Sequence, residues 1–189
     1  MGIIHKDLKP GNVMVDPATK MPKFIDFGHS DFYRNGMIGS LGIGTGFYKA
    51  PELLVNYYLY DFGVDIWAVG CMFAQMLFKI KHFFRPGGHG EYERSEQLAV
   101  IAEVLGTQAV VDYAAKYHLQ IEQNLQWVIK ASYPKKEWQE FVNEGNERYM
   151  SEEAFDLLTK LLTLDHAERI TARDALEHPY FKSIREMER

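Results

Sequence analysis

The hydrophobic residues in the later part of the chain recur at helical spacing. Residues 61–78 are apolar on nearly every side, which predicts a helix that is buried all round. Residues 95–105 open with a serine and end at a glycine, as a capped helix does. Residues 151–162 keep their leucines on one face behind an acidic start, and residues 171–178 end before a proline. The pattern therefore predicts a body built mostly from helices.

The first 50 residues have a different pattern. Residues 12–15 and 23–25 read as short extended pieces, and Pro10-Gly11 and Asp16-Pro17 mark turns beside them. Residues 29–49 contain five glycines and show little periodicity, which is typical of a loop. The predicted fold class is mainly α, with short β-pieces near the start.

Composition bounds the class of protein. The chain has 189 residues, enough for one domain with a sizeable core, and 47% of them are hydrophobic. A net charge of -5 gives no reason to expect nucleic acid as a partner. The single cysteine, Cys71, cannot form an internal disulfide, and the longest apolar run is too short for a membrane span. The start has no basic segment or long apolar stretch, so we expect no signal peptide, no membrane partner, and a cytoplasmic or nuclear location.

Residues 5–12, His-Lys-Asp-Leu-Lys-Pro-Gly-Asn, gather acidic, basic and amide groups in one turn-rich loop. Phosphoryl transfer needs a carboxylate near the attacking hydroxyl, divalent metal on the phosphates, and positive charge beside the transferring group. Asp7 can accept the hydroxyl proton, Lys9 can reach the γ-phosphate of ATP, and Asn12 can give an oxygen to Mg²⁺. Asp26 adds a charged oxygen ligand. These four are the candidate catalytic residues, and Lys9, Asn12 and Asp26 would hold the cofactors ATP and Mg²⁺, the metal through Asn12 and Asp26.

Further motifs follow this loop in an informative order. Asp26-Phe27-Gly28 comes first, and Ala50-Pro51-Glu52 comes next. The loop of residues 5–12 alone, or Asp26-Phe27-Gly28 alone, is better explained as an ordinary turn. A loop with this Asp and Asn, then Asp-Phe-Gly, then Ala-Pro-Glu is the signature of protein kinases, which the chain therefore resembles. The resemblance implies ATP as phosphoryl donor and proteins as substrates.

The resemblance extends to scaffold positions. Residues 65–70, Asp-Ile-Trp-Ala-Val-Gly, are similar to the Asp-x-Trp-x-x-Gly of the central buried helix of kinases. Arg169 is similar to a late arginine of the same family. The resemblance implies a buried ion pair between Glu52 and Arg169, and it implies that Asp65 braces the catalytic loop. These three residues would be structural rather than chemical.

More specifically, the chain resembles the catalytic alpha subunit of casein kinase II over nearly its whole length. The insert at 107–150 is typical of the wider group that holds this subunit. The resemblance implies a protein-kinase-like C-terminal lobe, with residues 1–189 running from the catalytic loop to the last helix of that lobe. It also implies that the N-terminal lobe, through which a beta-type regulatory subunit would bind, is lacking. The matching segments are 2–5, 51–55, 104–107, 160–162, 165–166 and 177–181.

The loop before Ala50 departs from the casein kinase II pattern. That family has two arginines and a lysine there, which read acidic residues after the target Ser or Thr. Here Gly42 and Gly46 stand at the arginine positions and Lys49 remains. Thr45 fits a hydroxyl near the catalytic loop better than a regulatory site. We therefore expect Lys49 and Thr45 to contact the substrate, with a weaker preference for acidic sequences.

The 189 residues hold no glycine-rich phosphate cover, strand lysine or paired glutamate, which a working kinase needs for ATP. We expect a truncated serine/threonine kinase that is inactive by itself. Whether the truncation is biological or an internal methionine taken as a start is left open. A non-catalytic binding module that uses the substrate-docking lobe is the alternative, although it would predict drift in the metal ligands. A helical domain of unrelated function is disfavoured by the ordered motifs.

The apolar helix at 61–78 carries one further expectation. In the kinase family a helix that precedes the catalytic loop packs along this element. Without that neighbour, several large side chains should lie bare on the helix. The residues expected to be bare are Trp67, Met72, Phe73, Met76 and Leu77.

Overall fold

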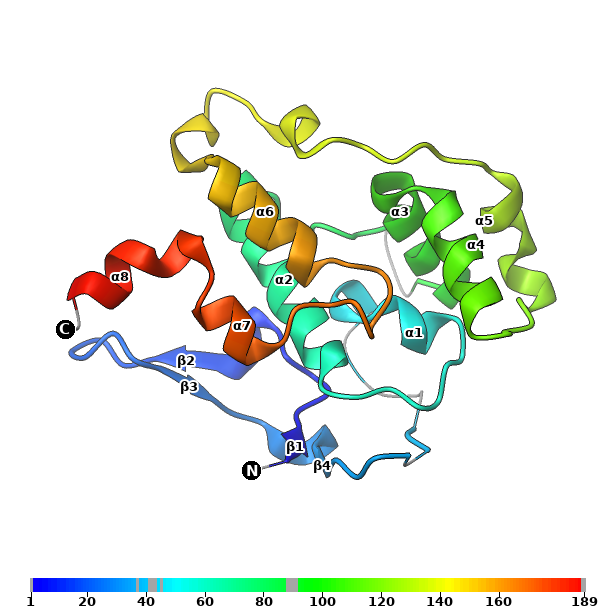
Figure 1. Ribbon diagram of the computed structural model, residues 1–189, viewed down its shortest axis with the longest axis horizontal. Helices are drawn as coiled ribbons and strands as arrows, with labels where there is room; N and C mark the ends of the chain where they lie inside the picture. Colours follow the sequence, from blue (N-terminus) through cyan, green and yellow to red (C-terminus); the bar gives the residue numbers. More distant parts are fainter. Residues whose placement is uncertain (1, 37, 41–43, 45, 88–91, 188–189) are drawn as a thin grey trace.

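The computed structural model has a mainly helical body with two small sheets on one side (Figure 1). The structure describes residues 2–36, 38–40, 44, 46–87 and 92–187. The mainly helical class predicted from the sequence is confirmed. Helices gather around a central one, and both sheets come from the first 32 residues.

Each sheet is a pair of short antiparallel strands. β2 (Val13–Val15) pairs with β3 (Pro22–Phe24), with Met14 opposite Lys23. These strands match the two predicted extended pieces within a residue. β1 (Ile3–Ile4) pairs with β4 (Asp31–Phe32), which lies in the segment expected to be loop. That expectation was wrong at β4 because a strand of two residues has no periodic pattern and exists only through its distant partner.

The central helix is α2 (Gly63–Phe78), and α6 (Glu152–Leu161) lies against it. Both helices were predicted from the sequence and are confirmed. The two approach closely at Gly70, where an added Cβ would lie 2.8 Å from a Leu162 methyl carbon. Ser151 caps α6, since its side chain accepts a hydrogen bond from the backbone N–H of Ala154. Because residue 70 is a glycine, α6 can lie close against α2 at this crossing.

The middle of the chain forms a helical group on the other side of α2. Its members are α1 (Pro51–Leu54), α3 (Arg94–Leu105), α4 (Thr107–Lys116) and α5 (Gln126–Lys130). The predicted helix at 95–105 is confirmed, but a reciprocal pair of Glu93 and Glu96 caps it rather than Ser95, which is buried. Across the described residues, no single helix is long and apolar enough to cross a membrane. The bent α3–α4 pair meets that test of length and composition only when its two helices are taken together.

The chain ends in a run of short helical pieces. α7 (Ala172–Leu176) confirms the predicted short helix that ends before Pro179, and Thr171 caps it. The expectation that this helix is the last one was wrong, because Pro179 opens a 3-10 turn and α8 (Lys182–Met187) follows. Proline is well suited to this position because the first residue of a helical turn needs no N–H donor.

Burial along α2 differs from the sequence expectation. Trp67 and Leu77 were expected to be bare but are buried, and Trp67 stacks on Phe84 with ring centroids 5.5 Å apart. Met76 is 69% exposed, and Met72 and Phe73 are partly buried. The helical group and α6 therefore cover most of α2, and its bare face is a single stripe.

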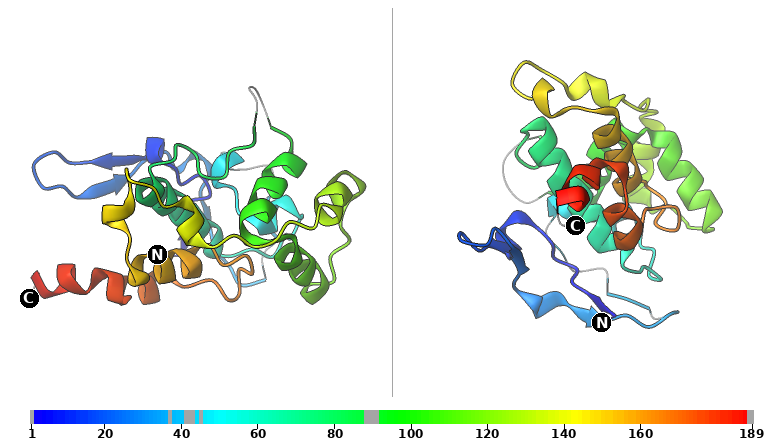
Figure 2. Two further views of the ribbon diagram at one scale, coloured as in Figure 1. Left: turned by 90° about the horizontal axis from the view of Figure 1, so that it is seen from above. Right: turned by 60° about the vertical axis from the view of Figure 1, so that its left-hand side comes forward.

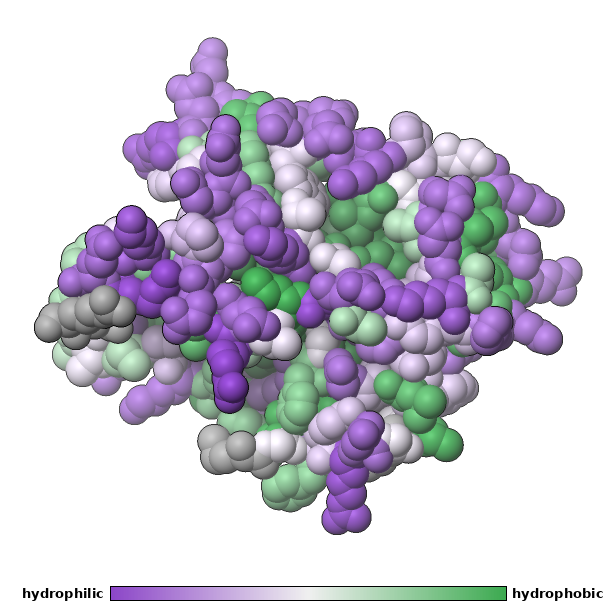
Figure 3. Space-filling model, in the orientation of Figure 1, coloured by the Kyte–Doolittle hydropathy of each residue, from purple (hydrophilic) through white to green (hydrophobic). Residues whose placement is uncertain are grey.

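That stripe forms the floor of a groove of about 1250 Å³, hereafter the α2 groove. Its walls come from the β2–β3 hairpin, α6, α7, α8 and the 3-10 turn before α8. Figure 2 shows the backbone of these elements in two further views. Hydrophobic residues also interrupt the hydrophilic surface on the face drawn in Figure 3. The charged residues among those lining the groove are Lys79 and Lys81. An apolar opening of this size is uncommon on soluble proteins, and the binding of a hydrophobic dye to it can be measured.

We expect the chain to bind a hydrophobic dye in the α2 groove. Met76→Glu should weaken dye affinity roughly tenfold, because one methionine-sized apolar contact is worth about 1.5 kcal/mol. Fluorescence titration measures this affinity. Met187→Glu is the matched control, since Met187 is 80% exposed and lies outside the groove lining. Equal dye affinity in the two variants would mean that the dye binds elsewhere.

Candidate active site

The loop of residues 5–12 holds three of the candidate side chains together. The Asp7 carboxylate is buried, and its Oδ2 accepts hydrogen bonds from Lys9 Nζ at 2.6 Å and Asn12 Nδ2 at 3.1 Å. Asn12 Nδ2 also donates to the Asp7 carbonyl at 2.8 Å. A 3-10 turn at Pro10–Asn12 folds the chain back so that Asn12 reaches Asp7. The structure thus places an acid, a cation and an amide at one point.

Asp65, in the first turn of α2, binds the backbone of this loop. The backbone N–H groups of His5 and Lys6 donate to its two carboxylate oxygens at 2.7 and 2.8 Å. Lys6 has a φ of 67°, a left-handed conformation that a non-glycine residue adopts only when its surroundings hold it. Burial raises the pKa of Asp65, although the two N–H donors oppose the rise. Two long-range hydrogen bonds therefore fix the shape of the loop from α2.

Asp26 lies beside the same loop but is exposed. Its backbone is left-handed, with φ 61°, and its Oδ1 accepts a long hydrogen bond from Gly28 N at 3.4 Å. The preceding residue, Ile25, donates its N–H to the Asn12 carbonyl at 3.0 Å, and its own carbonyl accepts from His5 Nε2 at 3.0 Å. These two bonds hold Ile25, and with it the following residue Asp26, close to the loop that contains Asn12.

The oxygens at this place suit a divalent metal. Asn12 commits its amide nitrogen to Asp7, which leaves its amide oxygen as the group that can meet a cation. Asp26 adds a carboxylate, and such hard oxygen ligands are those that Mg²⁺ prefers. In the described part of the chain, no group of three or more His, Cys, Asp or Glu side chains could hold a metal ion. A metal here would rely on an aspartate, an asparagine and oxygens from outside the chain.

The segment before α1 was expected to contact the substrate. Thr45 lies outside the described residues. Lys49 lines the same small cavity as Asp7, and among the described residues no hydrogen-bond or ion-pair partner of its ammonium is found. Burial lowers the pKa of Lys49, and the nearby charge of Arg94 lowers it further. A Cβ at Gly46 would lie 2.6 Å from Gln97 Nε2, so a larger residue there requires Gln97 to move.

Glu52 and Arg169 form the ion pair that was expected from the sequence. Arg169 Nη1 and Nη2 donate to the two Glu52 oxygens at 2.8 and 2.9 Å, and both side chains are fully buried. The same guanidinium donates to the carbonyls of Gly63, Thr163 and Leu164. Every arm of Arg169 is therefore satisfied, and it ties α1 to the start of α2.

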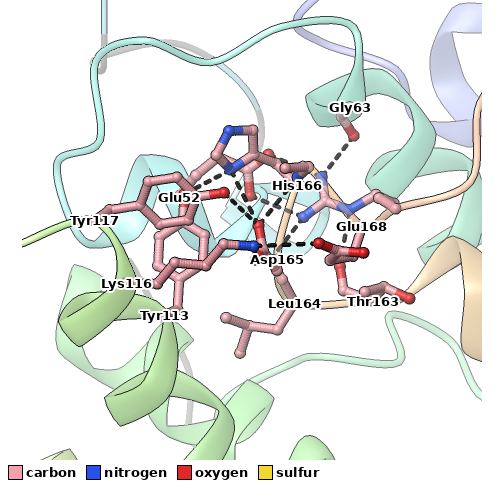
Figure 4. Close-up of polar contacts among 12 residues, drawn as sticks. Glu52, Gly63, Tyr113, Lys116, Tyr117, Thr163, Leu164, Asp165, His166 and Glu168 are labelled. Atoms are coloured by element: carbon pink, nitrogen blue, oxygen red, sulfur yellow. Dashed lines mark hydrogen bonds and ion pairs between the residues drawn. The ribbon is translucent and has the colours of Figure 1, made fainter.

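A polar cluster around this pair was missed by the sequence analysis (Figure 4). Tyr117 Oη donates to Asp165 Oδ1 at 2.7 Å, and Lys116 Nζ lies 2.5 Å from Asp165 Oδ2. Tyr113 Oη and His166 Nδ1 share a hydrogen bond of 2.9 Å. Burial raises the pKa of Tyr117 to about 12 and Asp165 adds to the rise. Burial works against Asp165, but hydrogen bonds from Lys116 and Tyr117 hold the pKa of its carboxyl below the usual value. In the sequence, Asp165-His166 was notable only as one of the segments in the resemblance described above. Nothing there indicated that Lys116 and Tyr117 would be the partners of Asp165.

The comparison with protein families agrees with this arrangement. A model of the protein kinase domain matches residues 1–181. That span includes the loop of residues 5–12, Asp26, Glu52, Asp65 and Arg169. Members of this family use ATP with a divalent metal and act on protein substrates. This chain belongs to the protein kinase domain family.

Proposed function

We propose that this chain is the phosphoryl-transfer part of a serine/threonine kinase of the casein kinase II alpha type. The observation that carries the proposal is the meeting of Lys9 Nζ and Asn12 Nδ2 on one Asp7 oxygen. A carboxylate held in this way is oriented to receive the proton of a substrate hydroxyl. Lys9 supplies positive charge where the transferring phosphoryl group would lie.

The remaining roles follow from position. Asn12 and Asp26 would hold Mg²⁺, which supplies charge neutralisation for the phosphates when it is bound with ATP. Asp7 would accept the proton of a Ser or Thr hydroxyl, and Lys49 and Thr45 would contact the substrate. Asp65 acts at a distance by holding the loop, and Glu52 and Arg169 act by holding α1 against the start of α2. The assignment of Thr45 rests on the family resemblance, and the other assignments rest on the geometry described above and on the family signature.

The resemblance to casein kinase II supports finer proposals. Residues 1–189 would form part of a kinase domain, from the catalytic loop to the last helix of the C-terminal lobe. A beta-type regulatory subunit would be a partner through an N-terminal lobe, and the enzyme would work in the cytoplasm or nucleus. Mixing this chain with such a beta subunit tests the partner proposal. If this chain alone bound the beta subunit, the binding surface would not be in an N-terminal lobe.

The 189-residue polypeptide, assayed by itself, is expected to transfer no measurable phosphate. Asn12 and Asp26 can hold metal, but these residues include no glycine-rich cover, strand lysine or paired glutamate to clamp the nucleotide. A radiolabelled ATP assay with casein and with a basic protein substrate measures the transfer. Turnover above that of an Asp7→Asn control would contradict this expectation.

A fusion that places an N-terminal kinase lobe, with its glycine-rich loop and strand lysine, before this chain is the active form to test. We expect it to phosphorylate Ser or Thr with only a weak demand for acidic residues after the target. Lys49 alone remains of three cationic contacts, and each lost charge-assisted hydrogen bond is worth about 1.5–3 kcal/mol. A peptide array measures the preference, and Lys49→Met should weaken what remains. A strong demand for Asp or Glu just after the target would refute the prediction.

A further inference from the structure

A tyrosine at the far end of α2 lies between two cations. Tyr149 closes a 3-10 turn at Glu147–Tyr149 and is 42% exposed. Arg148 Nη2 donates to its hydroxyl at 2.5 Å, and the Arg148 guanidinium lies 4.8 Å from the ring centroid. Lys79 Nζ lies 4.9 Å from the same centroid and comes from another part of the chain, since Lys79 directly follows α2. One phenol thus has cations from two parts of the chain.

The position of Tyr149 is set by a buried anchor. Asn146 is fully buried, and its Nδ2 donates to the carbonyl of Phe78, the last residue of α2, at 3.1 Å. That carbonyl is one of the groups that a helix leaves unpaired at its end. Tyr149 N donates to the Asn146 carbonyl at 2.9 Å, so the contact of Tyr149 with Lys79 lies beside the contact of Asn146 with Phe78. The anchor holds the phenol near Lys79 independently of its own surface contacts.

Within the described residues, neither Lys79 nor Arg148 has a carboxylate at ion-pair distance. The hydrogen bond from Arg148, with the charges of Arg148 and Lys79, lowers the pKa of Tyr149 even though burial opposes it. A doubly charged group on the Tyr149 oxygen would lie beside two positive charges that no carboxylate of the described residues neutralises.

We propose that Tyr149 is a phosphorylation site, with Arg148 and Lys79 as the clamp for its phosphate. In the transfer, a new bond forms between Tyr149 Oη and the γ-phosphorus of ATP, and the bond from that phosphorus to the bridging oxygen of ADP breaks. The phenolic proton passes to the general base of a separate tyrosine-directed kinase. The phosphate then joins residues 142–150 to the end of α2 by charge-assisted hydrogen bonds. This proposal does not depend on the function proposed above for the chain.

The experiment uses the 189-residue chain, a tyrosine kinase of broad specificity, and ATP with Mg²⁺. Peptide mapping should find phosphate on Tyr149, and Tyr149→Phe should remove it. In ³¹P NMR, the second pKa of this phosphate, near 6 in free phosphotyrosine, should be lower by roughly 0.5 unit or more in the native chain. In strong urea the unfolded chain no longer holds Lys79 beside the phosphate, so the part of the pKa shift that Lys79 causes should disappear.

Variants separate a clamp from a surface coincidence. Lys79→Met should remove most of the pKa shift of the phosphate. Lys81→Met, which changes a lysine two residues away, should leave the shift unchanged. Far-UV circular dichroism checks that both variants keep their helices. Three results would overturn the proposal. Tyr149 could stay unlabelled while Tyr58, which is 48% exposed, is labelled. The phosphate pKa could be the same in native and urea-unfolded chain, or it could be the same in the Lys79→Met variant as in the unchanged chain.

Discussion

Methionine in place of Arg169 is expected to lower the free energy of unfolding by about 3–5 kcal/mol. The change leaves the Glu52 carboxylate buried without its partner, and it removes donors from three backbone carbonyls. A charge left alone in the interior costs far more than the pair contributes, which is why the single change is severe. Since a domain of this kind has only about 5–15 kcal/mol of stability, the variant should be close to unfolding. Urea unfolding followed by circular dichroism measures the loss.

Two further variants test the reason for this effect. Glu168→Gln removes a carboxylate from an exposed ion pair with Lys116, so it should change stability little. Arg169→Met combined with Glu52→Leu should be less damaging than Arg169→Met alone, because no uncompensated carboxylate remains. If Arg169→Met cost no more than Glu168→Gln, the buried pair would not be important for stability.

Loss of the Asp7 carboxylate should reduce turnover of the fusion enzyme about a hundredfold to ten-thousandfold. This is the range that a positioned general base contributes, and Asp7→Asn keeps the shape of the side chain while it removes the basic oxygen. Asp26→Ala should cost at least as much, because the proposed metal site would keep only the oxygen of Asn12. Initial rates with a Ser or Thr peptide measure both variants.

A matched acid gives the control for these two changes. Asp16 lies in the turn between β2 and β3, where its carboxylate accepts hydrogen bonds from the Ala18 and Thr19 N–H groups of that turn. Asp16→Asn should leave the rate of the fusion enzyme unchanged. A near-normal rate for Asp26→Ala would show that the metal assignment is wrong. If the unchanged fusion enzyme bound nucleotide and peptide but transferred no phosphate, the alternative of a binding module would be favoured.

The candidate residues themselves could be found from the sequence because phosphoryl transfer needs particular residue types, and the family signature gives their order along the chain. Asp7, Lys9 and Asn12 lie within six residues of one another, so a single turn was sufficient to bring them together. The role of Asp65 also followed from a motif, since its neighbours Trp67 and Gly70 complete a known pattern. Short-range chemistry of this kind leaves a mark in the sequence.

Long-range partners left no such mark. Nothing near Asp165 indicates that Lys116 and Tyr117 lie against it, because contacts between residues about 50 positions apart depend on how α4 turns back. The same reason explains β4, which exists through its pairing with β1. The proposed clamp around Tyr149 needs the end of α2 beside residues 142–150, and the hydrogen bond from the buried Asn146 to the Phe78 carbonyl joins the two.

The sequence by itself determined the helical class, the main helices and the kinase signature, because hydrophobic spacing and reactive residue types are local properties. Only the tertiary structure decided which face of α2 stays open. The sequence shows that Trp67, Met76 and Leu77 are all apolar, and it cannot show which of them a neighbour covers. Packing against α6 and the helical group buries Trp67 and Leu77 and leaves Met76 in the groove, because burial depends on the partner surface and not on the residue alone.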